Sequence, residues 1–299
     1  MNPIQPSMAA QRYPTSLDSV TLPAEEFERL LEKGGPYPSQ NIVVTGNVEV
    51  GNLNSVTLPK GLRVEGNLEL RRCSGLISLP EGLSVEGRLY LFVCTGLKAL
   101  PAGLRVGGDL KLEGCKGLTD LPEGLSVGKN LDLWVCEGLK ALPAGLRVGG
   151  NLDLKGCTGL TALPEGLSIG GNLSIPRNLI KIKALPEGLS VGGRLDICDW
   201  KKLKALPKGL RVGTLVLRSE AIKLKQVQEG IRLSPSIRYL RLKGDPTPEC
   251  LEAVAGCIRE SRIRVLDLTK YMPEKAKMTL LHALRTNTSI SEVYFSGGF

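Results

Sequence analysis

The sequence predicts an α/β repeat solenoid, in which one short unit is stacked on itself many times around a parallel β-sheet. Five cysteines stand 21 residues apart, from Cys73 to Cys157, each within the pattern L-P-x-G-L-x-V-x-x-x-L-x-L-x-x-C-x-G-L. A fixed period of this length is typical of stacked repeats that contact only their neighbours. Aromatic residues make up only 4% of the chain, so stacked Leu and Val must build the core.

Leucine–proline pairs mark the units along the chain. They begin at Leu58, Leu79, Leu100, Leu121, Leu142, Leu163, Leu185 and Leu206, in steps of 21 residues with one step of 22. A degenerate unit at residues 41–50 precedes them, because its apolar pattern aligns with that of residues 61–70. The array therefore begins near Asn41.

Each unit predicts one coil of the solenoid. In Leu131-Asp132-Leu133 the alternation indicates a short strand whose leucines point inward and whose aspartate points outward. Proline has no N–H to donate, so we expect the L-P-x-G-L segment to run extended along the outer side of the coil. Glycine pairs such as Gly107-Gly108 allow the chain to turn into the next strand. About twelve strands are predicted on the sheet side.

This pattern resembles the leucine-rich repeat, L-x-x-L-x-L-x-x-N/C-x-L, which is met at Leu110, Leu112, Cys115 and Leu118. Asn178 takes the cysteine slot in a later unit. The resemblance implies a right-handed solenoid with a parallel sheet on its concave face and a Cys or Asn side chain that hydrogen-bonds backbone inside. Short units with L-P on the convex side are similar to the bacterial class that includes secreted effectors of the IpaH and YopM type. The G-L-x-V-G-G segment departs from that class, whose unit is about 20 residues.

The two ends of the chain change the pattern. Residues 237–242, 263–268 and 290–295 recur at steps of 26 and 27, separated by helical patterns at 248–258 and 273–284. This spacing is similar to ribonuclease-inhibitor-like repeats, in which a helix forms the convex side.

Four regions follow from these changes of pattern. We expect a disordered polar leader over residues 1–20, compatible with a secretion signal, and an N-terminal capping helix within 21–40. The 21-residue array covers 41–225, and the C-terminal repeats and cap cover 226–299.

Charge is unevenly distributed along the chain. Of the formal net charge of +9, residues 201–299 contribute 19 Lys and Arg against 9 Asp and Glu. This asymmetry favours either a solvated basic face or an acidic partner such as nucleic acid or an acidic membrane. Five basic residues cluster at its start: Lys201, Lys202, Lys204, Lys208 and Arg211. No run of about 18 apolar residues indicates a membrane span.

The sequence indicates no enzyme, cofactor or metal site. There is no C-x-x-C spacing and only one histidine, His282, so we interpret the cysteines as reduced core thiols in a reducing compartment. Parallel side chains in a ladder disfavour disulfides. Cys198-Asp199 lacks the C-x-D spacing of the secreted ubiquitin ligases, and we interpret it as structural. We interpret His282 as an incidental residue on the polar face of a predicted helix.

A duplication within the array points to the sheet face. Residues 79–120 and 121–162 match at 31 positions and differ at 11. Six differences fall on the outward strand positions: Arg88/Asn130, Tyr90/Asp132, Phe92/Trp134, Asp109/Asn151, Lys111/Asp153 and Glu113/Lys155. Ser84/Ser126 and Arg105/Arg147, on other sides, are unchanged. We therefore expect the strand face to be diversified for a partner, with Tyr90, Phe92 and Trp134 exposed on it as anchors.

The predicted partner-binding residues combine these aromatics with charged neighbours along the same face. They are Arg71, Arg72, Arg88, Tyr90, Phe92, Lys111, Asp132, Trp134, Asp153, Arg194, Arg218, Tyr239 and Arg241. The expected function is recognition of a protein partner through the concave face. The resemblance to the secreted bacterial class implies an effector delivered into the host cell cytoplasm, with the bacterial cytoplasm as the alternative location. Two other functions stay open: binding of nucleic acid or acidic membrane by the basic C-terminal third, and substrate recognition within an E3-like assembly.

Overall fold

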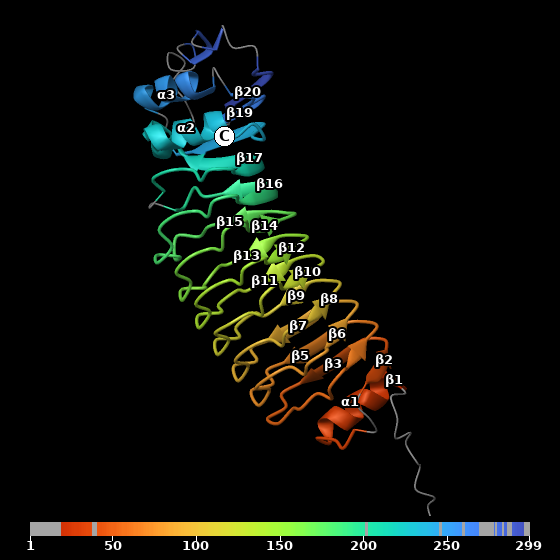
Figure 1. Cartoon of the computed structure of the whole chain (residues 1–299). Helices are drawn as coiled ribbons and strands as arrows, with labels where there is room; N and C mark the ends of the chain where they lie inside the picture. Colours follow the sequence, from red (N-terminus) through yellow and green to blue (C-terminus); the bar gives the residue numbers. More distant parts are fainter. Residues whose placement is uncertain are drawn as a thin grey trace, which may run out of the picture.

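The computed structural model describes residues 19–37, 41–200, 203–244, 247–258, 261–268, 278, 280–282, 284–285 and 289–295. The chain forms an elongated, gently curved stack of coils, with the N-terminal helix at one end and the last strand at the other (Figure 1). Successive coils pair through parallel strands in sequence order. The predicted repeat solenoid with a parallel sheet is confirmed.

One column of parallel strands runs the length of the stack, and we call it the main ladder. Each repeat contributes its L-x-L segment, so equivalent residues of neighbouring coils lie side by side. Twelve strands form it within the described ranges: β3 (Val48–Gly51), β5 (Leu68–Arg71), β7 (Leu89–Phe92), β9 (Leu110–Lys111), β11 (Leu131–Asp132), β13 (Leu152–Asp153), β15 (Leu173–Ser174), β16 (Ser190–Asp196), β17 (Arg211–Arg218), β18 (Tyr239–Lys243), β19 (Val265–Leu268) and β20 (Glu292–Phe295).

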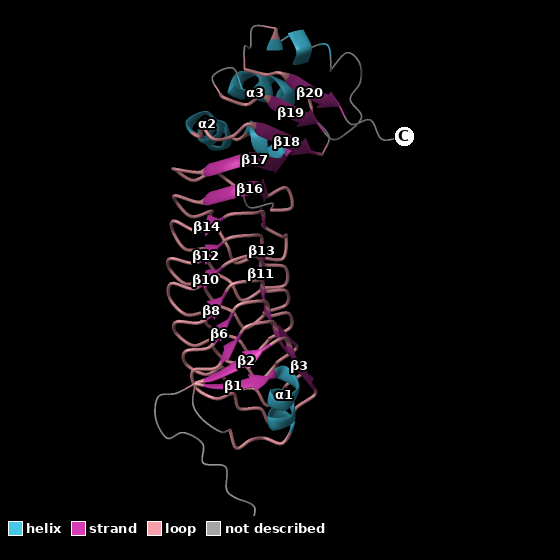
Figure 2. Cartoon of the chain, turned by 90° about the vertical axis from the view of Figure 1, so that its right-hand side faces the viewer, coloured by secondary structure: helices cyan, strands magenta, loops and turns pink. Residues whose placement is uncertain are grey.

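A second column of short parallel strands, the second ladder, stands beside the main ladder (Figure 2). It is built by the G-L-x-V segment. From the sequence pattern alone, this segment is expected only to lead into the glycine turn and not to form a strand. Its strands are β1 (Val20–Pro23), β2 (Ile42–Thr45), β4 (Arg63–Val64), β6 (Ser84–Val85), β8 (Arg105–Val106), β10 (Ser126–Val127), β12 (Arg147–Val148) and β14 (Ser168–Ile169), followed by the first residues of β16 and β17. The valine of each unit is buried and the preceding Ser or Arg points outward. The extra G-L-x-V-G-G length therefore gives each coil a second strand.

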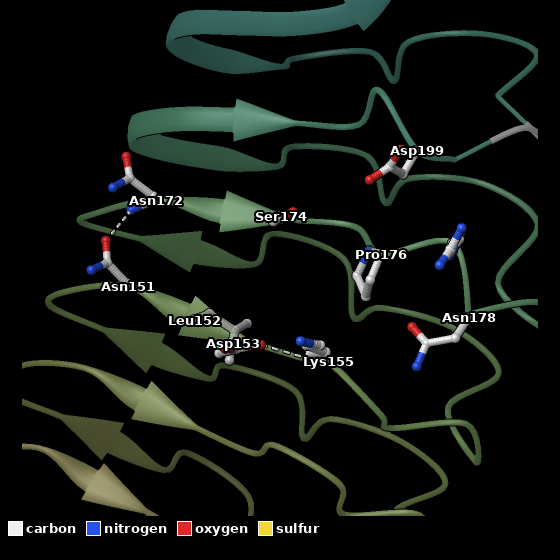
Figure 3. Close-up of a pocket in the computed structure, with 10 residues that line it drawn as sticks. Asn151, Leu152, Asp153, Lys155, Asn172, Ser174, Pro176, Asn178 and Asp199 are labelled. Carbon is white, nitrogen blue, oxygen red and sulfur yellow. Dashed lines mark hydrogen bonds between the residues drawn. The ribbon is translucent and has the colours of Figure 1, made fainter.

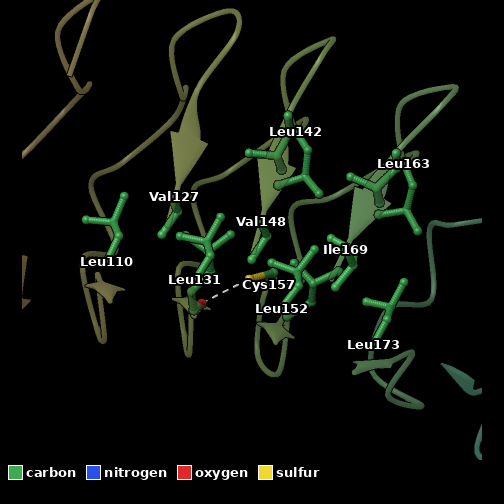
Figure 4. Close-up of a cluster of buried hydrophobic side chains, with 14 of the residues drawn as sticks. Leu110, Val127, Leu131, Leu142, Val148, Leu152, Cys157, Leu163, Ile169 and Leu173 are labelled. Carbon is green, nitrogen blue, oxygen red and sulfur yellow. Dashed lines mark hydrogen bonds between the residues drawn. The ribbon is translucent and has the colours of Figure 1, made fainter. Parts of the chain in front are cut away.

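Leucine, valine and isoleucine from both ladders fill the space between them (Figure 4). The five cysteines at 21-residue intervals are all fully buried there. Four of their thiols donate to the carbonyl of the leucine 24 residues earlier, as Cys136 does to Leu112 and Cys157 to Leu133, both at 3.0 Å, whereas Cys73 donates to the Arg71 carbonyl at 3.5 Å. Burial raises the pKa of Cys115 to about 11 and that of Cys157 to about 12, so these thiols stay protonated.

Helices lie at the two ends of the stack. Helix α1 (Ala24–Glu32) buries Phe27 and Leu31 and packs against β3. Toward the other end, η1 (Ser219–Lys223), α2 (Lys225–Leu233) and α3 (Pro248–Ile258) lie on one side of the C-terminal coils and β18 to β20 on the other (Figures 1 and 2). A helix thus takes the place of the extended outer segment, as the longer period predicts. The expected leader over residues 1–20 and helix over 273–284 fall largely outside the described residues.

Glycines set how closely the coils stack. In the C-x-G-L segment a side chain would collide with the preceding coil: an added Cβ at Gly96, Gly117 or Gly138 would lie 2.1–2.5 Å from a backbone carbonyl oxygen. Real Cβ atoms do not approach so closely. The glycine that recurs two residues after the cysteine therefore allows the coils to stack at this spacing.

We expect Gly117→Ala to lower the free energy of unfolding by about 2 kcal/mol or more, because its Cβ would overlap the Thr95 carbonyl oxygen at 2.3 Å. The matched control is Gly256→Ala in helix α3, where an added Cβ meets nothing within 4 Å. There alanine should raise the free energy of unfolding by about 0.5–1 kcal/mol. Urea denaturation measures the free energy of unfolding of both variants. Equal changes in the two variants would contradict the claim that the glycine after the cysteine is needed for close stacking of the coils.

Candidate functional site

The outward residues of the main ladder form rows that cross the coils. The residue between the two leucines of each strand lies beside its equivalent in the next coil, so Tyr90, Lys111, Asp132 and Asp153 follow one another in register. Arg71 and Phe92 pair in the same way in the row that follows the second leucine. The structure therefore brings the central part of the predicted site onto one face, which we call the ladder face.

An aromatic and cationic cluster lies at the N-terminal part of the ladder face. The Tyr90 ring lies between two cations, with Arg71 Cζ and Lys111 Nζ each 5.7 Å from its centroid. Phe92 packs against it with a centroid distance of 5.9 Å and an interplanar angle of 51°. The Tyr90 hydroxyl donates to Glu113 at 3.1 Å. Burial and the Glu113 charge raise the pKa of Tyr90 to about 12, so the hydroxyl remains a donor.

The packing in this cluster corrects one expectation. Tyr90 and Phe92 are half-buried, because they cover each other and lie against the cations, and only Trp134 is exposed, at 43%. Lys155 Nζ lies 5.9 Å from the Trp134 ring centroid. The Trp134 backbone N–H donates to Asp132 Oδ1 at 2.9 Å, which fixes the end of this strand. Of the three predicted anchors, Trp134 is therefore the most available to a partner.

Two of the predicted arginines border a small hollow beside the cluster. Arg71 is held by Glu69 at 2.8 Å and Glu49 at 3.3 Å. Arg72 is exposed and has a left-handed φ of 53°. With Tyr90 and Phe92 they line a hollow of about 410 Å³. Arginine beside aromatic rings is the composition of interface anchors.

Carboxylates gather on the ladder face next to Trp134. Asp132 lies in register with Asp153, and Glu113 approaches it from the preceding coil. Burial, followed by the charges of Glu113 and Asp153, raises the pKa of Asp132 to about 6. The ladder face therefore has an acidic part beside its aromatic and cationic part.

A second row of side chains, missed at the sequence level, ties the coils together. At the position before the first leucine, the side-chain oxygen accepts the backbone N–H of the next coil: Asp109 from Asn130 at 3.0 Å, Asn130 from Asn151 at 2.8 Å and Asn151 from Asn172 at 2.7 Å. Asn67 does the same for Arg88 at 2.7 Å. Two of the six outward differences, Arg88/Asn130 and Asp109/Asn151, therefore lie in this row, where the side chain serves the stacking of the coils. The asparagine that recurs directly before L-x-L is the sequence feature that could have revealed the row.

The ladder face opens into a polar hollow where the 22-residue step falls (Figure 3). Strand β15 ends at Ser174, and Pro176, which has no N–H, follows it. The hollow, of about 900 Å³, is lined by Asn151, Leu152, Asp153, Lys155, Asn172, Ser174, Pro176, Arg177, Asn178 and Asp199. Asn178 does not fill the cysteine slot as expected: it is half-buried, and its Oδ1 accepts from no described residue.

The remaining predicted residues lie along the C-terminal coils of the main ladder, away from the aromatic cluster. Each is paired with a carboxylate, and these partners are Asp196 for Arg194, Asp199 for Arg218 at 3.6 Å, and Asp267 for Tyr239 at 2.5 Å and for Arg241 at 2.8 Å. Arg88 is likewise held between Glu69 at 3.9 Å and Asp109 at 3.5 Å. All of these pairs except that of Arg194 with Asp196 connect neighbouring coils, so the side chains also contribute to the stability of the ladder.

The described residues also bear on three other features: a metal site, a reactive cysteine or histidine, and a membrane span. Among the described residues no group of His, Cys, Asp and Glu could hold a metal ion. Cys198 is buried, with Lys243 Nζ 3.4 Å from its sulfur, and His282 is exposed. No described helix is long and apolar enough to cross a membrane.

Fold and face together define a solenoid of the leucine-rich-repeat type that presents an aromatic, cationic and acidic surface on its main ladder. The chain itself matches no protein-family model and no curated protein.

We expect Asp132→Asn to raise the free energy of unfolding at pH 8 by about 1 kcal/mol, allowing for solvent screening. A carboxyl with a raised pKa contributes stability that is complete below its unfolded pKa of about 4 and is lost as the pH rises through about 6. The asparagine keeps the acceptor for the Trp134 N–H but cannot ionise. The difference between variant and wild type should therefore vanish near pH 4, and a gain that persists at that pH would refute this assignment.

Proposed function

We propose that this protein is a recognition scaffold that binds a protein partner through the ladder face. The observation that carries the proposal is the cluster of Tyr90 and Phe92 with Arg71 and Lys111, together with the exposed Trp134 further along the same face. On the second ladder of these coils, by contrast, the outward residues are only Ser and Arg. Aromatic side chains and arginine are the residues that most often dominate the binding energy of protein interfaces.

The rigidity of the ladder supports this proposal. The backbone of each coil is hydrogen-bonded to the next, as Leu112 N is to Asp132 O and Gly114 N to Trp134 O, both at 2.8 Å. Side chains on such a surface lose little further freedom when a partner binds, which lowers the entropic cost of association. The polar hollow, which Lys155 helps to line, extends the same face and adds amide and charged groups to it.

We further propose that the partner is a host protein and that the chain acts as a secreted bacterial effector in the host cytoplasm. This part rests on the resemblance of the L-P units to the secreted bacterial class. Eight buried, unpaired thiols support a reducing compartment, which the host cytoplasm and the bacterial cytoplasm both provide. In an E3-like assembly the same face would select the substrate, and the catalytic part would come from another chain.

The test is affinity capture from host lysate with three forms of the full chain. Wild type and Ile77→Ala/Ile180→Ala, which removes exposed side chains (65% and 61%) outside the main ladder, should recover the same partner. Phe92→Ala/Trp134→Ala should lose it, with an affinity at least about 100-fold weaker for the purified pair, because truncated anchors typically cost 2 kcal/mol or more each. Recovery of the same proteins by the anchor variant would contradict the proposal.

A further inference from the structure

A cluster of arginines lies in the C-terminal coils, apart from the ladder-face cluster. Arg238, Arg262 and Arg264, together with Ser289, line a hollow of about 380 Å³. They come from three successive coils, at the points where the chain leaves the outer side and enters β18, β19 and β20. The site is independent of the proposed function, because none of these residues belongs to the predicted partner-binding set.

Backbone hydrogen bonds hold the arginines next to one another. Arg264 N donates to Arg238 O at 2.8 Å, and Ser291 N donates to Arg264 O at 2.8 Å. The Arg238 side chain is half-buried, and its Nη1 donates to the Pro235 carbonyl at 2.5 Å. The hollow is therefore built on strand ends and on one guanidinium that is already oriented.

The charge of this hollow is uncompensated within the described chain. None of its three arginines forms an ion pair with a described residue, whereas six other arginines do: Arg63, Arg71, Arg88, Arg194, Arg218 and Arg241. Unpaired arginines also occur singly, as at Arg105 and Arg147, but a serine coil separates those two. Neighbouring like charges on adjacent strands are destabilising. Three cations around one hollow therefore indicate a place for an anion.

We propose that this hollow binds phosphoryl groups of a small anion that carries at least two of them, either free in solution or as a lipid headgroup. The planar guanidinium donates two parallel hydrogen bonds to phosphate oxygens. A phosphoryl group carries a charge of about −1.5 to −2 at neutral pH. Two phosphoryl groups therefore balance the positive charge of the three arginines, whereas the single negative charge of a carboxylate does not. The volume lies within the range of about 300–1,000 Å³ of small-ligand sites.

The proposal is tested with inorganic tripolyphosphate by calorimetry and with phosphatidylcholine vesicles containing phosphatidylinositol bisphosphate by flotation, both at near-physiological salt. The site variant is Arg262→Gln/Arg264→Gln. The control, Arg105→Gln/Arg147→Gln, removes the same two charges from the exposed face of the second ladder. Thermal melting of both variants confirms that they fold.

We expect the site variant to bind at least about tenfold more weakly than wild type, and the control to stay within about twofold, because each charge-assisted bond contributes to affinity only at the hollow. This pattern with tripolyphosphate supports a free phosphate ligand, and with vesicles alone it supports a lipid headgroup. Equal losses in both variants, which would reflect net charge only, overturn the proposal. So does the absence of wild-type binding in both arms.

Discussion

The close approach of successive coils is the constraint on which the rest of the structure depends. Glycine two residues after each of the five periodic cysteines leaves room for the neighbouring backbone, and the parallel hydrogen bonds of the main ladder then fix the register between neighbouring coils. A one-residue slip in a ladder would turn every inward leucine outward. The 21-residue period is therefore preserved because each coil is the template for the next.

The same register places like residues side by side, with opposite consequences inside and outside. Inside, stacked leucines and cysteines pack without polar conflict, and the thiols satisfy backbone carbonyls. Outside, identical positions bring charges together: Asp132 beside Asp153, and Arg238 beside Arg264. Outward side chains in register stabilise the sheet only when opposite charges alternate or when small amides take their place, as in the asparagine row. Where neither occurs, like charges repel each other, and either a bound ligand or a change of protonation would relieve the repulsion.

Periodicity was sufficient to predict the solenoid, the main ladder, the buried cysteine column and helix α3, because these follow from which residues recur. It could not reveal the second ladder, because within the 21-residue units its strands are only two residues long, such as Arg105–Val106, and look like the approach to a glycine turn. It also missed what depends on the neighbouring coil. No single unit contains the distances between side chains on which three features depend. These are the half-burial of Tyr90 and Phe92, the hydrogen bond from Asn151 N to Asn130 and the ion pair of Arg241 with Asp267.

The structure also narrows the meaning of the internal duplication. Once the asparagine row is set aside, four outward differences remain between the two halves, and they lie in the two central rows: Tyr90/Asp132, Phe92/Trp134, Lys111/Asp153 and Glu113/Lys155. Two of them reverse a charge, and one replaces an aromatic ring by a carboxylate. Because the leucines, glycines and cysteines between them are unchanged, the face altered its chemistry without any change in register. A partner that spans both halves must therefore complement an aromatic and cationic surface at one end and a carboxylate-rich one at the other, which disfavours a purely polyanionic ligand for this face.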